Sequence, residues 1–281
     1  MSRFIDRLVT WGDRVAAWGA RLLRTRGIRR AWLVVASIVG VVLLAGGTSQ
    51  VAERLAHEER TEVAEYPASR LDALEVDNEA GSITVVGVDG ADTVTVHARI
   101  SDGLRATGHE VAERDGRLVV DGSCPLFGSS WCEVDYTIEV PSDLHVDVDG
   151  FESITVSDVD GGLVAHSVAG AIELARVGGD VAVSANQGRL EATDLTADRV
   201  EASANQGRVS LEFTESPRAI DVEANQGRVE IVLPDDDEVA YATVTESDQG
   251  SVSDTIRQDP NSDRSIRVEA NQGSITITYA T

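Results

Sequence analysis

One triplet, Asn-Gln-Gly, returns at nearly regular intervals near the C-terminal end of this chain. Its four copies are Asn186-Gln187-Gly188, Asn205-Gln206-Gly207, Asn225-Gln226-Gly227 and Asn271-Gln272-Gly273, and Asp248-Gln249-Gly250 is a fifth copy with one conservative change. Successive copies start 19, 20, 23 and 23 residues apart. A period of this length is typical of chains built from stacked structural repeats.

Apolar and polar residues alternate on both sides of each triplet. Around the second copy, Val200, Ala202 and Ala204 precede the turn, and Val209 and Leu211 follow it. Period-two alternation predicts strands with one buried face, and stacked neighbours must complete the core because one repeat cannot bury that face alone. We therefore predict an all-β fold, a β-solenoid (β-helix) of repeats of roughly 18–23 residues.

The fifteen triplet residues are interpreted as corner architecture rather than as a binding or catalytic site. Asn and Gly tolerate the positive φ that a sharp corner demands, and identical amides stacked about 4.8 Å apart can form a hydrogen-bonded ladder. Ala precedes all four Asn-Gln-Gly copies, which indicates room for only a methyl group. The Asp248 copy has Thr243, Thr245 and Ser247 at the alternating positions before it, so its core should be weaker.

The Arg residues after Gly are expected to pair with nearby Glu, with an anion-binding Arg stripe as the alternative; they are Arg189, Arg208 and Arg228.

The N-terminal part of the chain is basic and then apolar. Residues 1–30 hold eight Arg and two Asp (+6), whereas the remaining 16 Arg and 46 acidic residues give −30. Residues 31–47 carry no charge and predict a transmembrane helix, with the Arg-rich side in the cytoplasm and the C-terminal domain outside the plasma membrane. A cleaved signal peptide is the alternative. Apolar residues at helical spacing in 1–24 predict an amphipathic helix on the inner leaflet, or else a coiled-coil seam.

Between the membrane segment and the repeats, three further features are expected. Residues 48–70 are polar and predict a charged helical stalk, and residues 71–143 predict a less regular β cap before the repeats of 144–281. Cys124 and Cys132 lie eight residues apart, which suits a disulfide closing a hairpin loop and does not match the spacing of a zinc half-site. A disulfide requires an oxidising compartment outside the cytoplasm.

The pattern as a whole resembles the bacterial putative-adhesin family of β-strand-repeat proteins, whose function is unknown. The resemblance covers roughly residues 71–281 and rests on three segments and on the serial Gly-x-Ile/Val turns; the segments are Leu74-Glu75-Val76 leading to Gly81-Ser82-Ile83-Thr84-Val85, Ile138-Glu139-Val140-Pro141, and Val232-Leu233-Pro234. It implies a β-solenoid and, by name, adhesion. It brings no catalytic residues.

Sequence motifs for chemistry are scarce. The five His residues are scattered, no nucleotide-binding or nucleophile motif occurs, and Asp147, Asp149, Asp158 and Asp160 are interpreted as turn residues rather than calcium ligands. The acidic main domain would repel nucleic acid. We expect a non-enzymatic, cofactor-free surface or envelope module that binds a protein or a glycan. The alternatives are an accessory component of envelope sensing coupled through the N-terminus and, less favoured, a polysaccharide-active enzyme.

Overall fold

The structure is a computed structural model that describes residues 58–103, 105–125 and 132–280. The predicted amphipathic helix of 1–30, the predicted transmembrane helix of 31–47 and the first part of the predicted stalk lie outside these residues. Sixteen strands and one short 3-10 turn make up the described part, so the prediction of an all-β fold is confirmed there. Within it, no helix is long and apolar enough to cross a membrane.

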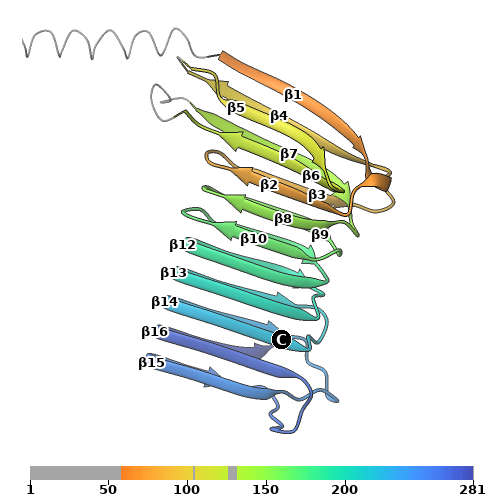
Figure 1. The fold of residues 1–281 in the computed structure, drawn as a ribbon. Helices are drawn as coiled ribbons and strands as arrows, with labels where there is room; N and C mark the ends of the chain where they lie inside the picture. Colours follow the sequence, from red (N-terminus) through yellow and green to blue (C-terminus); the bar gives the residue numbers. More distant parts are fainter. Residues whose placement is uncertain (1–57, 104, 126–131, 281) are drawn as a thin grey trace, which may run out of the picture. The chain divides into compact units, whose positions relative to one another are not determined.

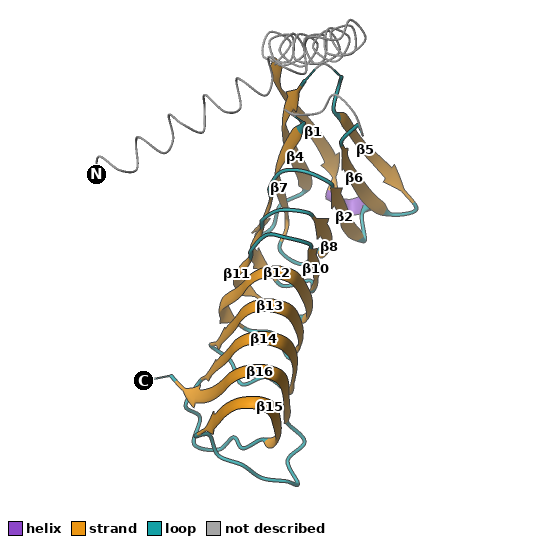
Figure 2. Ribbon diagram, turned by 90° about the vertical axis from the view of Figure 1, so that its left-hand side faces the viewer, coloured by secondary structure: helices purple, strands orange, loops and turns teal. Residues whose placement is uncertain are grey.

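The Asn-Gln-Gly repeats form five long, bent strands that pair in parallel (Figure 2). The pairing places every triplet opposite the next, so that Gly188 faces Gly207 and Gly207 faces Gly227. Each strand continues through its corner, and the halves before and after the corner lie on two different walls (Figure 2). The strands are β12 (Asp180–Leu195), β13 (Arg199–Phe213), β14 (Ala219–Leu233), β15 (Ala242–Asp254) and β16 (Ser265–Tyr279).

The order of these strands in the sheet differs from their order in the chain. β14 pairs with β16, and β16 pairs with β15, so the last repeat lies between the third and the fourth (Figure 1). The Asp248 copy therefore lies at the end of the sheet, where β15 has a neighbour on one side only among the described strands. The spacing of the triplets does not reveal this exchange, because both strands carry a corner triplet, Asp-Gln-Gly in β15 and Asn-Gln-Gly in β16, in the same register.

Pairs of shorter strands continue the two walls toward the N-terminus. β10 (Leu163–Ser167) pairs in parallel with the first half of β12, and β11 (Ile172–Val177) pairs with its second half. The next pair is β8 (His145–Gly150) with β9 (Ile154–Val159), and the pair after that is β2 (Ala73–Asn78) with β3 (Ile83–Val88). Gly170 lies at the corner beside Gly188, as the spacing of the repeats predicts.

Antiparallel strands end both walls on the N-terminal side. β6 and β7 still pair in parallel with β2 and β3, but β5 runs antiparallel to β6, β4 to β7 and β1 to β4. The helix predicted for residues 48–70 is wrong over Glu58–Pro67, because this segment pairs with all of β4 as an edge strand. The elements are β1 (Glu58–Pro67), η1 (Ala68–Arg70), β4 (Thr93–Asp102), β5 (Gly108–Arg114), β6 (Arg117–Ser123) and β7 (Glu133–Pro141).

The core lies between the two walls and consists mainly of aliphatic side chains. Alternate residues are buried in most strands, as period-two alternation predicts, whereas β1, β5 and β15 have no fully buried residue. Tyr136 and Tyr241 are the largest fully buried side chains. The Ala residues before the four Asn-Gln-Gly corners are at most 6% exposed, so these methyl groups point into the core; they are Ala185, Ala204, Ala224 and Ala270.

Glycine is required at the corners by the neighbouring strand. Gly207 has a φ of +147°, and a Cβ atom placed there would lie 1.6 Å from the carbonyl oxygen of Gly188. Asn205 and the other triplet Asn residues have ordinary negative φ, so only Gly uses the positive φ expected of both residue types. The glycines let successive backbones approach one another at the corner.

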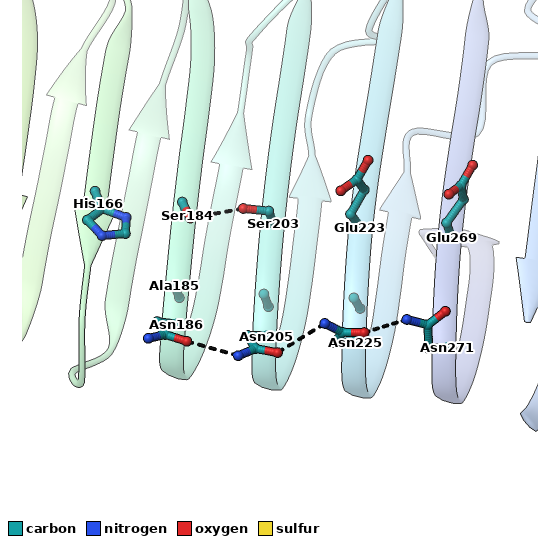
Figure 3. A pocket seen from close by; sticks show the side chains of 12 residues that line it. His166, Ser184, Ala185, Asn186, Ser203, Asn205, Glu223, Asn225, Glu269 and Asn271 are labelled. Carbon is teal, nitrogen blue, oxygen red and sulfur yellow. Dashed lines mark hydrogen bonds between the residues drawn. The ribbon is translucent and has the colours of Figure 1, made fainter.

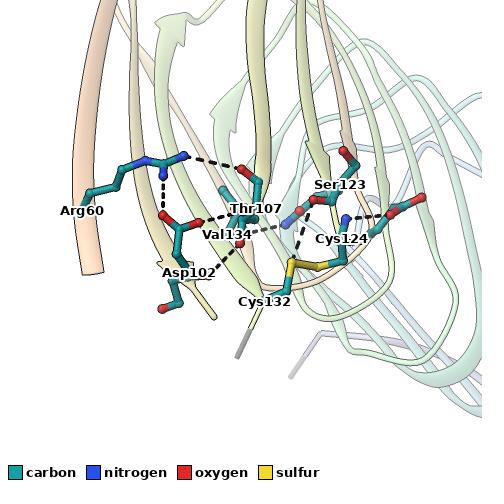
Figure 4. Close-up of a disulfide and its surroundings, with 10 residues drawn as sticks. Arg60, Asp102, Thr107, Ser123, Cys124, Cys132 and Val134 are labelled. Carbon is teal, nitrogen blue, oxygen red and sulfur yellow. Dashed lines mark hydrogen bonds and ion pairs between the residues drawn. A yellow bond between two sulfur atoms is a disulfide. The ribbon is translucent and has the colours of Figure 1, made fainter. Parts of the chain in front are cut away.

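The predicted disulfide between Cys124 and Cys132 is present (Figure 4). It does not close a hairpin, because β6 and β7 do not pair with each other; each lies on a different wall. The disulfide instead bridges the corner between the end of β6 and the start of β7. The backbone N–H of Cys124 donates to Oε2 of Glu79 on the adjacent turn at 2.9 Å.

Candidate functional site

A polar groove of about 460 Å³ crosses the outer face of five adjacent strands, just before their corners (Figure 3). The strands are β10 and the first halves of β12, β13, β14 and β16. They lie on one wall, and each contributes outward side chains. The side chains carry hydroxyl, amide, imidazole and carboxylate groups; they are His166, Ser184, Asn186, Ser203, Asn205, Glu223, Asn225, Glu269 and Asn271.

A ladder of asparagine amides forms one side of the groove (Figure 3). Nδ2 of Asn205 donates to Oδ1 of Asn186 at 3.0 Å, and Nδ2 of Asn225 donates to Oδ1 of Asn205 at 3.1 Å. Nδ2 of Asn271 continues the series by donating to Oδ1 of Asn225. The hydrogen-bonded ladder predicted from the stacked triplets is therefore formed, and it fixes the orientation of successive amides.

A second column of side chains lies two residues before the asparagines. The strand register places His166, Ser184, Ser203, Glu223 and Glu269 opposite one another in that order. Oγ of Ser203 donates to Oγ of Ser184 at 2.9 Å. Glu269 pairs with Arg267, whereas Glu223 has no ion pair within the described residues. Hydroxyl groups thus occupy the middle of the column and carboxylates one end.

A smaller hollow of about 350 Å³ adjoins the first on the same wall. The two share His166, Ser184, Ser203 and Glu223, so they form one continuous depression. The added lining is mixed, with five apolar residues and two carboxylates; it consists of Val164, Ala165, Ala182, Val183, Ala202, Glu201 and Asp221.

On the far side of the corners, the Gln and Arg residues of the repeats are exposed to solvent. Arg189 lies 3.8 Å from Glu191, so the predicted Arg–Glu pairing is confirmed there. The pairing is wrong for the other two: Arg228 contacts Oγ of Ser274 at 3.4 Å, and Arg208 makes no ion pair within the part of the chain that the structure describes.

Acidic side chains gather on the outer face of β6, β2 and β8. Asp121, Asp77 and Asp149 lie in register on these three strands. Burial raises the pKa of Asp77, and the charges of Asp149 and Asp121 raise it further. Burial likewise raises the pKa of Asp147. No group of three or more His, Cys, Asp or Glu in the described residues is arranged to hold a metal ion.

The turn interpretation of the Asp pairs is wrong for Asp147 and Asp149, because both belong to strand β8. Their Asp-Val-Asp pattern is period-two alternation, with Val148 buried between them. Asp158 has a φ of +60° and forms an ion pair with Arg176 at 2.6 Å, and this contact holds its pKa below the usual value.

A buried polar contact near the disulfide corner is structural. Nδ1 of His109 lies 2.9 Å from Oη of Tyr136, and this hydroxyl donates to the carbonyl oxygen of Asp121 at 3.0 Å. Burial raises the pKa of Tyr136 and lowers that of His109. These groups join β5, β6 and β7 on the inside of the two walls, away from the polar groove.

The groove combines the predicted triplet asparagines with residues that were not predicted. The triplets were predicted as architecture, and their Asn side chains also line the groove. The second column was missed because its members differ from strand to strand. The sequence signal for this column was the shared position of its members, two residues before Asn. Strand alternation places a residue at that position on the outer face, beside the tight corner.

The described part of the chain is thus an all-β domain with a polar groove along its repeats. No protein-family model matches the sequence, and no curated protein does. Among solved structures, a putative cell adhesion protein from Clostridium sporogenes is 14% identical over 79% of this chain and 100% of its own, with a TM-score of 0.38. A putative adhesin from Bacteroides fragilis is 14% identical over 79% of this chain and 97% of its own, with a TM-score of 0.41.

A putative lipid binding protein from Parabacteroides distasonis is also similar, at 11% identity over 79% of this chain and 97% of its own, with a TM-score of 0.30. The adhesin names agree with the resemblance that the sequence shows. Because all three TM-scores lie below 0.5, the similarities carry no further argument.

Proposed function

We propose that this chain is a membrane-anchored β-solenoid that is displayed outside the cytoplasm and acts as a non-enzymatic surface or envelope interaction module. The observation that carries the proposal is the continuous polar groove along the stacked repeats (Figure 3). Parallel strands in one register repeat the same outward positions at strand spacing, so the wall presents an extended binding surface rather than a single catalytic pocket.

The placement outside the cytoplasm has two supports. The uncharged segment 31–47 follows an Arg-rich segment, as in an N-terminal anchor with its basic side in the cytoplasm. The Cys124–Cys132 disulfide closes a corner of the domain, and such bonds persist in oxidising compartments. The side chains of the groove support binding by hydrogen bonds.

A protease added to intact spheroplasts tests the placement. The expected result is loss of the repeat domain while a cytoplasmic marker protein survives; survival of both would contradict display.

Binding is tested by sedimenting the full chain, purified in mild detergent, with insoluble envelope material from the organism that makes it. Retention in the pellet is expected, and a chain that stays in the supernatant would contradict an envelope interaction.

Deletion of residues 1–28 separates display from the alternative role in envelope sensing. If the chain only displays the domain, the truncated protein sediments with envelope material as the full chain does. If it couples to a cytoplasmic partner, the deletion abolishes recovery of that partner from the membrane fraction.

A further inference from the structure

We propose that the polar groove binds a neutral, linear glycan whose sugar units follow one another along the asparagine ladder. The inference rests on the proposed interaction function and names the chemical class of its partner. Sugar hydroxyl groups both donate and accept hydrogen bonds, so a site for them needs donors and acceptors in alternation rather than a single charge. The groove supplies both kinds (Figure 3).

The ladder leaves fixed hydrogen-bonding groups for a ligand. An Asn amide has two N–H donors and an oxygen with two lone pairs. Asn205 uses one donor toward Asn186 and one lone pair toward Asn225. One N–H and one lone pair remain, and the amide is already held in place. Because the groups are oriented before binding, less conformational entropy is lost when a ligand engages them.

The second column adds the complementary groups. Ser203 donates to Ser184, so the hydrogen of the Ser184 hydroxyl and the lone pairs of Ser203 are available to a ligand. The carboxylate of Glu223, which is exposed and has no ion pair within the described residues, can accept two hydroxyl groups. A hydroxylated polymer in the groove therefore meets an amide on one side and a hydroxyl or carboxylate on the other.

The length of the groove favours a polymer over a single sugar. It crosses five strands, from β10 to β16, and four strand spacings of about 4.8 Å give a span of about 19 Å. Amides repeat on four of these strands. A regular array at fixed spacing can make the same contacts with successive units of a repeating ligand, and each unit adds to the affinity.

Charge excludes an anionic glycan as the ligand of the groove, and surface chemistry excludes a protein partner. An anionic glycan would meet Glu223, Glu269 and Glu201 in a chain whose net charge is −24. A protein partner usually needs buried aromatic or aliphatic anchors at the centre of its interface. The groove offers amides and hydroxyls there, and its neighbour adds only Val164 and Ala182 as outward apolar side chains.

Calorimetry on the full chain in mild detergent tests the proposal. The probes are three neutral hexasaccharides (cellohexaose, maltohexaose and the N-acetylglucosamine hexamer) and one anionic hexasaccharide, oligogalacturonate. We expect at least one neutral probe to bind and oligogalacturonate to bind at least about tenfold more weakly. Absence of binding by all three neutral probes, or tighter binding of the anionic one, would overturn the proposal.

Strand β13 provides a matched pair of variants. Ser203 and Ser210 are both half-buried outward serines on this strand, but Ser203 lines the groove and Ser210 lies on the wall beyond the corner. Ser203→Phe fills the groove and is expected to weaken neutral-glycan binding at least about tenfold, whereas Ser210→Phe should bind as the wild type does. Equal affinities for the two variants would overturn the assignment of the site.

A second pair on β14 avoids bulky substitutions. Glu223→Gln, in the groove, is expected to weaken binding about three- to tenfold, and Glu230→Gln, on the other wall, to leave it unchanged.

Sedimentation with envelope material separates failure of the glycan proposal from failure of the proposed interaction function. If the full chain sediments but Ser203→Phe and Glu223→Gln change nothing, the glycan groove is wrong and the interaction function stands. If the wild type does not sediment, the interaction function itself fails.

Discussion

Two neighbouring strands, β16 and β15, carry nearly the same corner triplet and differ in almost everything around it. In β16 the inward residues Ile266, Val268 and Ala270 are buried, as in the other regular repeats. Their partners in β15 are Thr243, Thr245 and Ser247, which are only partly buried. The difference follows from position, because among the strands that the structure describes β16 has a neighbour on each side and β15 has a neighbour on one side only.

The comparison separates two requirements of the repeat. The triplet directs the path of the backbone and is kept at the end of the sheet, whereas an apolar core is kept only where neighbours on both sides exclude water. The outward residues of β15 suit an edge as well, since Glu246 and Asp248 are exposed there. Charged side chains on an edge strand oppose pairing with another chain.

The largest expected effect concerns the corner glycines. Gly207→Ala would place a Cβ atom 1.6 Å from the carbonyl oxygen of Gly188 at a φ of +147°, so we expect a loss of about 3 kcal/mol or more in the free energy of unfolding. Gly250→Ala on β15 should cost about 1 kcal/mol, because an edge strand can shift away from its single neighbour. Urea denaturation followed by circular dichroism measures both.

Gly90→Ala is the control for backbone strain alone. Gly90 has a φ of +67°, and no atom would lie within 4 Å of its added Cβ, so a loss of about 1 kcal/mol is expected. Equal losses at Gly207 and Gly90 would mean that stacking does not impose glycine at the corner.

Core substitutions test the second requirement. Val268→Ala removes two buried methyl groups between β14 and β15 and should cost about 2 kcal/mol. Thr245→Ala, at the partner position of β15, should change the free energy of unfolding by less than about 0.5 kcal/mol. Thermal or urea unfolding of the pair gives the difference. A loss at Thr245 as large as at Val268 would mean that the end of the sheet is covered after all.

The features that the sequence predicted correctly depend on local patterns that recur. Alternation around the corner, Ala before it and Gly within it each depend on one strand and its immediate neighbours. Four copies share the Ala and all five share the Gly, so the repeats define these features well. The weak core of the Asp248 copy follows in the same way, from Thr and Ser at inward positions.

The features that were missed depend on which strands become neighbours. Exchanging β15 and β16 preserves every corner and register, so the spacing of the triplets does not distinguish the two orders; the polar inward residues of the Asp248 copy predicted a weaker core there but not its place in the sheet. The strand at Glu58–Pro67 was missed because an edge strand with charged residues reads like a solvated helix. The groove was missed because Ser203 and Glu223 differ in residue type, although both stand two residues before Asn and pair in register.

The asparagine ladder should contribute a smaller amount to stability. Asn225→Ala removes the hydrogen bond donated to Asn205 and the one accepted from Asn271, and a loss of about 1 kcal/mol is expected for two exposed bonds. Asp248→Ala, at the same corner position in β15, should change stability by less than about 0.5 kcal/mol. Denaturant unfolding compares them, and equal effects would contradict a stabilising ladder.

The smallest expected effect is a gain at the end of the ladder. Oδ1 of Asn271 accepts no hydrogen bond within the described residues, because the neighbouring Asp248 carboxylate has no hydrogen to donate. Asp248→Asn supplies a donor and should stabilise the domain by about 0.5 kcal/mol. Removal of the Asp248 charge also makes it easier for β15 to pair with a strand of another chain. Sedimentation velocity should therefore show more self-association than in the wild type.

Glu246→Gln removes the same charge from the same strand at an exposed position outside the ladder. It should increase self-association as Asp248→Asn does but leave the free energy of unfolding unchanged. If the two substitutions stabilise the domain equally, the gain comes from reduced charge repulsion, and Asp248 does not end the ladder for lack of a donor. If only Asp248→Asn stabilises it, the difference between β15 and its neighbour at this corner is one hydrogen bond.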